Sequence, residues 1–170
     1  MSGGFDWPER VEVVDSHTEG EPTRTVVEGW PQPEGRTMAE RRDFLLEHQD
    51  RLRQAVVCEP RGHDAVVGAL LTPPVEPGSA TGVVFFNNKG ALGMCGHGLI
   101  GVVRTLEFLE HLAPGAVRID TLVGTVSQLV LNRLATLSYD TILGCSREEQ
   151  ALRGAGSAVR PRIALTTSLS

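Results

Sequence analysis

The chain has 170 residues with a formal net charge of -5, and 41% of its residues are hydrophobic. This length fits one domain or one lobe of a larger protein, and the composition is that of a folded chain. The excess of acidic over basic residues, 21 against 16, argues against a nucleic-acid-binding surface. No apolar run is long enough to cross a bilayer, and the first residues lack the pattern of a secretory signal. We therefore expect a cytoplasmic protein without nucleic-acid or membrane partners.

Strands and one surface helix are predicted for the first half of the chain. Alternation and β-branched residues predict strands at 11–15 and 23–28, with turn residues between them. Thr37 and Glu40 have the spacing of a capping box, which predicts a helix over 37–53. Three apolar runs bounded by proline and glycine predict further strands at 55–58, 65–71 and 82–86.

A buried helix is predicted in the second half, over residues 99–112. Apolar side chains nearly encircle its first turns, which is typical of a helix inside a core, and Pro114 ends it. Strands at 117–120 and 125–131 follow. A buried helix among strands indicates an α+β fold in which a sheet wraps around a central helix.

The three cysteines are Cys58, Cys95 and Cys145. An odd and sparse set does not predict a disulfide framework, and none of them are paired at the spacing of a zinc site. Cys58 follows two valines and is expected to pack in a core strand.

Cys95 has the most unusual surroundings in the sequence. Five glycines lie close to it, and it comes just before the predicted buried helix. Free N–H groups and the dipole at a helix N-terminus favour negative charge, so we expect the thiol pKa to be lowered. The same N–H groups can hold a carboxylate. A buried cysteine that only packs in a tight turn is the alternative.

The segment Met94-Cys95-Gly96-His97-Gly98 resembles the first catalytic-cysteine motif of the proline racemase family. Separate segments at 14–24, 59–63, 85–88, 117–121 and 123–126 resemble other motifs of that family, so the resemblance covers roughly residues 11–128. Within the family, the sequence of residues 15–22 is most similar to that of the 4-hydroxyproline epimerases.

The resemblance implies an isomerase that inverts the Cα of a small amino acid, 4-hydroxyproline or proline, without a cofactor or metal. One cysteine removes the α-proton as a thiolate and a second delivers a proton to the opposite face. Cys95 would be one of this pair, and Gly96, His97 and Gly98 would bind substrate. The implied fold is the diaminopimelate-epimerase type, with two lobes, each a strongly bent, mostly antiparallel sheet around a central helix. A homodimer is also implied.

The chain departs from the family in its last part. Members are roughly twice as long, and the segment expected around the second cysteine is absent. Cys145 has one preceding glycine, Gly144, and no apolar helix after it. We expect residues 1–128 to form the N-terminal lobe and residues 129–170 a divergent tail, disordered or produced by a frameshift. A truncated chain of this kind would be an impaired enzyme.

Three other functions stay open at this point. A trans-3-hydroxyproline dehydratase resembles the racemases but lacks the second cysteine. A truncated, non-catalytic remnant would perform no chemistry. A cysteine hydrolase could use Cys95 with His97, but two residues so close along the chain would struggle to form an oriented nucleophile–base pair.

Several other polar residues within the motifs have a structural and a functional interpretation. His17 and His63 lie in turn-rich segments, where holding loops by hydrogen bonds is the favoured role. Asn87 and Asn88 could orient substrate or form a turn. Asp15 and Glu21 could form an acid/base pair of carboxylates, although surface and turn roles are favoured.

Overall fold

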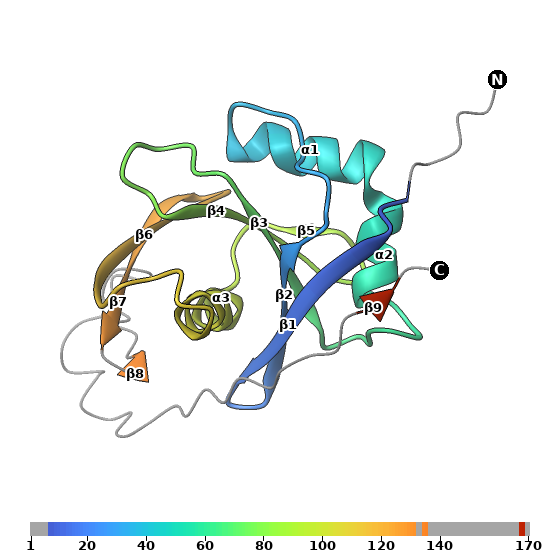
Figure 1. Cartoon of the computed structure of the whole chain (residues 1–170). Helices are drawn as coiled ribbons and strands as arrows, with labels where there is room; N and C mark the ends of the chain where they lie inside the picture. Colours follow the sequence, from blue (N-terminus) through green and yellow to red (C-terminus); the bar gives the residue numbers. More distant parts are fainter. Residues whose placement is uncertain (1–6, 132–133, 136–166, 169–170) are drawn as a thin grey trace.

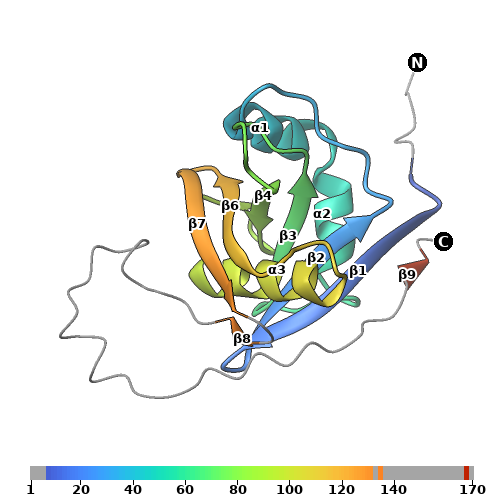
Figure 2. The same cartoon turned by 60° about the vertical axis from the view of Figure 1, so that its left-hand side comes forward.

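A computed structural model describes residues 7–131, 134–135 and 167–168 of the chain. In this part of the chain one curved sheet encloses a helix on its concave side, and two other helices lie on its opposite face (Figures 1 and 2). The fold is of the mixed α+β class, as the sequence predicts.

The sheet has the strand order β8-β7-β6-β4-β3-β2-β1-β9, with β5 paired to β4. Two of its pairings, β2 with β3 and β4 with β6, are parallel, and the other pairings among the described residues are antiparallel. The strands are β1 (Arg10–Thr18), β2 (Glu21–Glu28), β3 (Val67–Thr72), β4 (Thr81–Phe86), β5 (Ala91–Leu92), β6 (Gly115–Thr121), β7 (Gly124–Leu131), β8 (Leu134–Ala135) and β9 (Thr167–Ser168). The helices are α1 (Met38–His48), α2 (Asp50–Val57) and α3 (Gly96–Phe108).

The central strands β3 and β4 are covered on both faces. Successive side chains of a strand point to opposite faces, and here they enter two different apolar clusters. Leu70 and Phe86 join the cluster on the side of α1 and α2, whereas Ala69 and Phe85 join the cluster around α3. Continuous apolar runs in these two strands therefore reflect burial from both sides.

Helix α3 is the buried helix that the sequence predicts. Leu99, Val102 and Val103 are at most 1% exposed, and they pack in the cluster that β3, β4, β6 and β7 also supply. The helix begins three residues earlier than predicted, at Gly96, and ends at Phe108. The earlier start makes Cys95 its N-cap residue.

The predicted helix over 37–53 is two helices, and the strand predicted at 55–58 is wrong. Thr37 and Glu40 form the expected capping box of α1, but Gln49 leaves helical geometry and α2 then continues to Val57. Val56 and Val57 are β-branched, which favoured a strand. In α2 they are buried together with Leu52, at the spacing of one helical face, and this packing outweighs local propensity.

The hairpin of β1 and β2 is longer than the predicted strands, because β1 continues to Thr18. A two-residue turn, Glu19 and Gly20, joins the strands, and both residues have positive φ angles. Turns of this kind match the twist of paired strands. The extension matters for the site because the tip of the hairpin lies beside the N-terminus of α3.

Candidate active site

The backbone of Cys95 forms the junction between extended chain and helix α3. Its φ and ψ angles are -143° and 110°, and its carbonyl accepts the bond from the Leu99 N–H at 2.9 Å. Its side chain is half-buried against the apolar cluster around α3. The thiol therefore lies at the end of the helix where N–H groups have no intrahelical partner.

The ring of His97 lies against this thiol. The Sγ atom of Cys95 is 3.5 Å from Nδ1 of His97 and 3.7 Å from Nε2. The two nitrogens lie on either side of Cε1, so a sulfur almost equidistant from both cannot lie on the N–H axis of either one. The contact is therefore not the aligned hydrogen bond of a nucleophile–base pair, which argues against the cysteine hydrolase.

The pKa of the Cys95 thiol is raised from its ordinary value, contrary to the expectation from its place before a helix. Burial is the largest cause because it disfavours the thiolate, and the negative charge of Glu21 acts in the same direction. A hydrogen bond from the backbone N–H of Gly98 lowers the pKa but does not offset burial. The sequence motif correctly predicts that Cys95 lies at a helix N-terminus, but it does not reveal that the Cys95 side chain packs against apolar residues.

Two glycines of the motif have different surroundings. A Cβ atom on Gly98 would lie 2.9 Å from Cε1 of Phe85 and 3.1 Å from Sγ of Cys95, so this position has no room for a side chain. A Cβ atom on Gly96 would meet nothing within 4 Å. The first turn of α3 is therefore packed tightly on the side of Gly98 and open on the side of Gly96.

Asn87 and Asn88 form the turn that leads to Cys95. The Asn87 side chain accepts hydrogen bonds from the backbone N–H groups of Lys89 and Gly90, at 2.9 and 3.2 Å. Asn88 donates to Oδ1 of Asp64 at 2.7 Å. The turn alternative thus accounts for the Asn87 side chain, and the Asn88 side chain links this turn to Asp64.

The other candidate side chains of the motifs have structural partners. Nδ1 of His17 accepts from the N–H of Gly20 at 3.4 Å, and Nδ1 of His63 accepts from the N–H of Ala65 at 3.3 Å. These contacts fit the loop-holding role that the sequence favours. Asp15 is paired with Arg24 across β1 and β2, which explains the carboxylate without acid/base chemistry.

Sequence reasoning missed the central role of Asp120, which is 2% exposed. Its carboxylate accepts from the N–H groups of Val75 and Glu76 at 2.7 and 2.9 Å, and from the hydroxyls of Ser79 and Thr125 at 2.7 Å each. Burial alone would raise its pKa, but these donors lower it from the usual range. Asp120 ends the predicted strand 117–120, in which apolar and polar residues alternate, and this pattern gives no sign that its side chain is buried.

Cys58 does not lie at the candidate site with Cys95. Cys58 is the C-cap residue of α2 and packs against the cluster on the opposite face of the sheet. It therefore packs against the core as expected, but it follows a helix instead of lying in the predicted strand 55–58. Cys145 lies outside the described residues.

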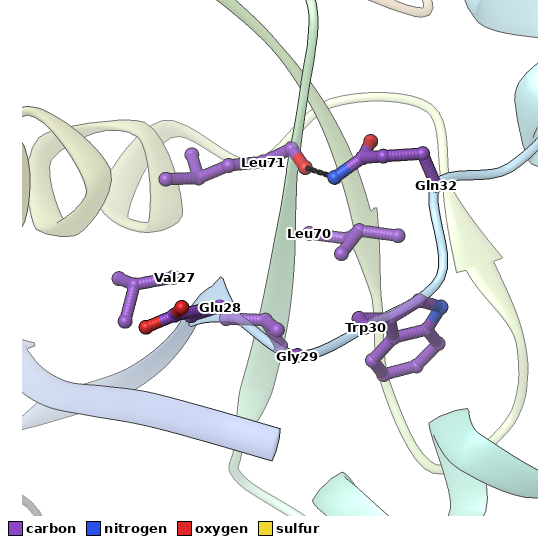
Figure 3. Close-up of a pocket in the computed structure, with 8 residues that line it drawn as sticks. Val27, Glu28, Gly29, Trp30, Gln32, Leu70 and Leu71 are labelled. Carbon is purple, nitrogen blue, oxygen red and sulfur yellow. Dashed lines mark hydrogen bonds between the residues drawn. The ribbon is translucent and has the colours of Figure 1, made fainter. Parts of the chain in front are cut away.

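A pocket of about 200 Å³ lies apart from Cys95, at the ends of β2 and β3. Figure 3 shows Trp30, Leu70 and Leu71 around it, with Gln32 donating to the Leu71 carbonyl at 3.4 Å. Glu28 is its only lining residue with a titratable side chain, so it offers no acid/base pair. None of the residues that line this pocket belongs to the segment 94–98 around Cys95.

Within the described ranges, no group of three or more His, Cys, Asp or Glu side chains has the arrangement of a metal site. None of the helices described here has the length and apolar character needed to cross a membrane.

The sequence profile of the family described as proline racemase matches residues 13–136, which include Cys95, most of the hairpin of β1 and β2, and all of α3. The chain belongs to the proline racemase family.

The curated relatives within this family include 4-hydroxyproline 2-epimerases of Burkholderia cenocepacia and Pseudomonas putida. The chain is 61% identical to the first over 117 residues and 57% identical to the second over 118 residues. Each match covers 69% of this chain and 38% of the relative. The chain thus spans well under half the length of the curated relatives that it matches.

Two solved structures resemble the fold described here. A hydroxyproline epimerase from Agrobacterium vitis, with bound trans-4-hydroxy-L-proline, has a TM-score of 0.69 and 25% identity, covering 75% of this chain and 39% of that protein. A probable proline racemase from Agrobacterium radiobacter, with bound carbonate, has a TM-score of 0.66 and 25% identity, covering 72% of this chain and 38% of that protein.

Proposed function

We propose that this chain supplies one half of the active site of a 4-hydroxyproline 2-epimerase, with Cys95 as one of two thiols that exchange the α-proton. The proposal rests on one observation: the half-buried Cys95 thiol lies at the N-terminus of α3, against His97 and beside an open face at Gly96. The names of the curated relatives support 4-hydroxyproline over proline as substrate.

In this proposal the free N–H groups of the first turn of α3 bind the carboxylate of the substrate. Their partial positive charge also stabilises the negative charge that builds there when the α-proton leaves. Gly96 has no side chain to block this approach, whereas Gly98 keeps its N–H pointed at Sγ of Cys95. His97 contacts the thiol and contributes to the wall of the same site.

The raised pKa of Cys95 defines its form before substrate binds. At neutral pH a thiol with a pKa above its ordinary value is protonated, so Cys95 begins as a proton donor. In one direction it gives its proton to the α-carbon and becomes a thiolate, while the second thiol, initially ionised, takes the α-proton from the other face. In the reverse direction the two exchange roles.

We further infer that the sheet and α3 are one lobe of a two-lobed fold of the diaminopimelate-epimerase type. Residues 1–128 form the main part of this lobe and residues 129–170 a divergent tail in this proposal, with β7 continuing into the tail as far as Leu131. The second thiol then belongs to a lobe that corresponds to the part of the relatives that this chain does not match. The lobe described here supplies only one of the two proposed catalytic thiols, so by itself it could not exchange protons on both faces of the substrate.

The remaining parts of the proposal follow from the family resemblance. The reaction uses no cofactor, and the complete enzyme is a homodimer. Turnover that survives dialysis against a chelator would support cofactor independence, and sedimentation of the complete enzyme would test the dimer.

A chimera tests the proposed activity. Residues 7–131 of this chain replace the matching segment of the Burkholderia cenocepacia relative, which supplies the rest of the length. We expect the chimera to convert trans-4-hydroxy-L-proline to its 2-epimer, measured by chiral chromatography. Retained secondary structure with no product would favour the non-catalytic remnant, and formation of a dehydrated product from trans-3-hydroxyproline would favour the dehydratase.

A further inference from the structure

Helix α3 meets the hairpin of β1 and β2 through hydroxyl groups rather than through an apolar surface. Ser16 and Thr18 of β1 and Thr23 and Thr25 of β2 alternate along their strands and are all 7% exposed or less. Residues two apart on a strand share a face, so the four hydroxyl side chains line one side of the hairpin. We call these four residues the hydroxyl seam.

The matching residues of α3 are His97, Gly101 and Thr105, which are four residues apart and therefore lie on one face of the helix. Thr18 donates its hydroxyl hydrogen bond to the His97 carbonyl at 3.3 Å. At the other end of this face, the Thr105 hydroxyl donates to the Thr25 hydroxyl at 3.5 Å, and both side chains are fully buried.

Between these two contacts the helix backbone touches the hairpin. A Cβ atom on Gly101 would lie 2.7 Å from Oγ of Ser16 and 2.8 Å from Cβ of Thr23. The Thr23 hydroxyl has no hydrogen-bond partner among the described residues, so this residue contributes contact rather than a bond. The close approach leaves no room for the helix to move toward the strands.

Apolar packing is non-directional and permits small shifts along a helix axis, whereas a hydrogen bond to a particular carbonyl specifies one position. The opposite side of α3 is held by apolar contacts, including those of Leu99 and Val102. The directional contact at the first turn is the one from Thr18. It acts on the carbonyl of His97, whose ring lies against the Cys95 thiol.

We propose that Thr18 is a positioning residue, which fixes the first turn of α3 and thereby holds the Cys95 thiol in its half-buried place. The importance of this placement for catalysis rests on the proposed function, but the placement itself does not. Without the Thr18 hydroxyl, the first turn loosens and water reaches the thiol. The thiolate is then better solvated, and Cys95 ionises at lower pH.

The test measures alkylation of Cys95 by iodoacetamide from pH 6 to pH 10 in the intact chain, with each cysteine followed by peptide mass spectrometry. Only the thiolate reacts, so the pH profile reports the ionisation of Cys95 without any turnover. We expect Thr18→Val to shift the midpoint downward by about half a unit, which raises the rate below the midpoint about threefold. Thr18→Ser keeps the hydroxyl and should restore the original profile.

Thr25→Val is the matched control, because it removes a hydroxyl from the other end of the same seam, far from Cys95. It should leave the Cys95 profile unchanged, and Cys58 in the same samples reports general unfolding. If Thr18→Val does not fold, Thr18→Ala gives the same readout with fewer atoms to accommodate. An unchanged Cys95 profile in the folded Thr18 variant, an equal shift in Thr25→Val, or no restoration by Thr18→Ser would each overturn the proposal. Because no step requires substrate, failure of the epimerase activity leaves this result unaffected.

Discussion

The guanidinium of Arg24 and the carboxylate of Asp15 face each other across β1 and β2 through two hydrogen bonds of 2.7 Å each. The remaining nitrogen of Arg24 donates to the carbonyls of Val56 and Arg61, at 2.8 and 2.6 Å. One side chain therefore links the hairpin to the end of α2 and to the loop that follows it. The pKa of Arg24 is raised, chiefly by its hydrogen bond with Asp15.

The first prediction concerns this link. Arg24→Lys should lower the free energy of unfolding by about 1 to 3 kcal/mol, because a lysine cannot make the paired bonds and reach both carbonyls. Urea denaturation followed by the fluorescence of the buried Trp30 measures the change. Arg42→Lys, at an exposed pair with Asp43, should change stability by less than about 0.5 kcal/mol. Equal effects of the two substitutions would show that the four bonds of Arg24 contribute nothing beyond surface charge.

Asp120 gives a prediction with a defined pH dependence. Its folded pKa is lowered, so its carboxylate stabilises the fold above the unfolded pKa of about 3.9, and this stabilisation is lost as the pH falls through the folded pKa. Asp120→Asn should cost about 2 to 4 kcal/mol at pH 7, because a buried acceptor of four hydrogen bonds is replaced by a neutral amide. The difference in free energy of unfolding between the native chain and Asp120→Asn should become smaller below about pH 4.

Urea midpoints between pH 3 and pH 7 test this behaviour, with the exposed Asp43→Asn as control. If the urea midpoints of the native and Asp120→Asn proteins differ by the same amount over that whole range, the ionised Asp120 carboxylate does not stabilise the fold.

Gly101 provides a steric prediction. Gly101→Ala should destabilise the chain by about 1 to 3 kcal/mol, because the added methyl group overlaps Ser16 and Thr23. Gly96→Ala is the matched control in the same helix, where the methyl group meets nothing within 4 Å and stability should change little. Thermal unfolding by circular dichroism compares the two variants. Higher stability of Gly101→Ala, as alanine would give in an exposed helix, would show that α3 does not approach the hairpin this closely.

Glu21 carries a prediction for the thiol itself. Its negative charge raises the pKa of Cys95, so Glu21→Gln should lower that pKa and speed alkylation of Cys95 at pH 8. Glu19→Gln, at the same hairpin tip, is the control and should leave the rate unchanged. A slower reaction after Glu21→Gln would mean that the carboxylate assists ionisation instead of opposing it.

The sequence predicts best those helices and strands whose pattern of apolar and capping residues fits one type of secondary structure. The apolar residues of α3 from Leu99 onward favour a buried helix, and the spacing of Thr37 and Glu40 favours the start of a helix. The strand predicted at 55–58 is wrong because four apolar residues in a row fit both a buried strand and part of a buried helix. Only the packing of Val56 and Val57 with Leu52 decides between the two.

At the candidate site, the sequence predicts the place of Cys95 before α3 but not the sign of its pKa shift. The glycines and the helix N-terminus are local features that can be read from neighbouring residues. Burial of the thiol depends on contacts made by β-strands far away in sequence, and the link from Thr18 to His97 spans 79 residues. The four donors of Asp120 likewise come from two separate segments, which no local pattern reveals.

Exchange of the substrate α-proton tests the central claim most directly. The chimera and its Cys95→Ser and Cys58→Ser variants are incubated with trans-4-hydroxy-L-proline in D2O, and loss of the α-proton signal is followed by NMR. We expect exchange in the chimera and in Cys58→Ser, and none in folded Cys95→Ser, because serine cannot replace the thiol as acid or base at neutral pH. Exchange retained by Cys95→Ser at the rate of the parent chimera would contradict the assignment of Cys95 as a proton-transfer residue.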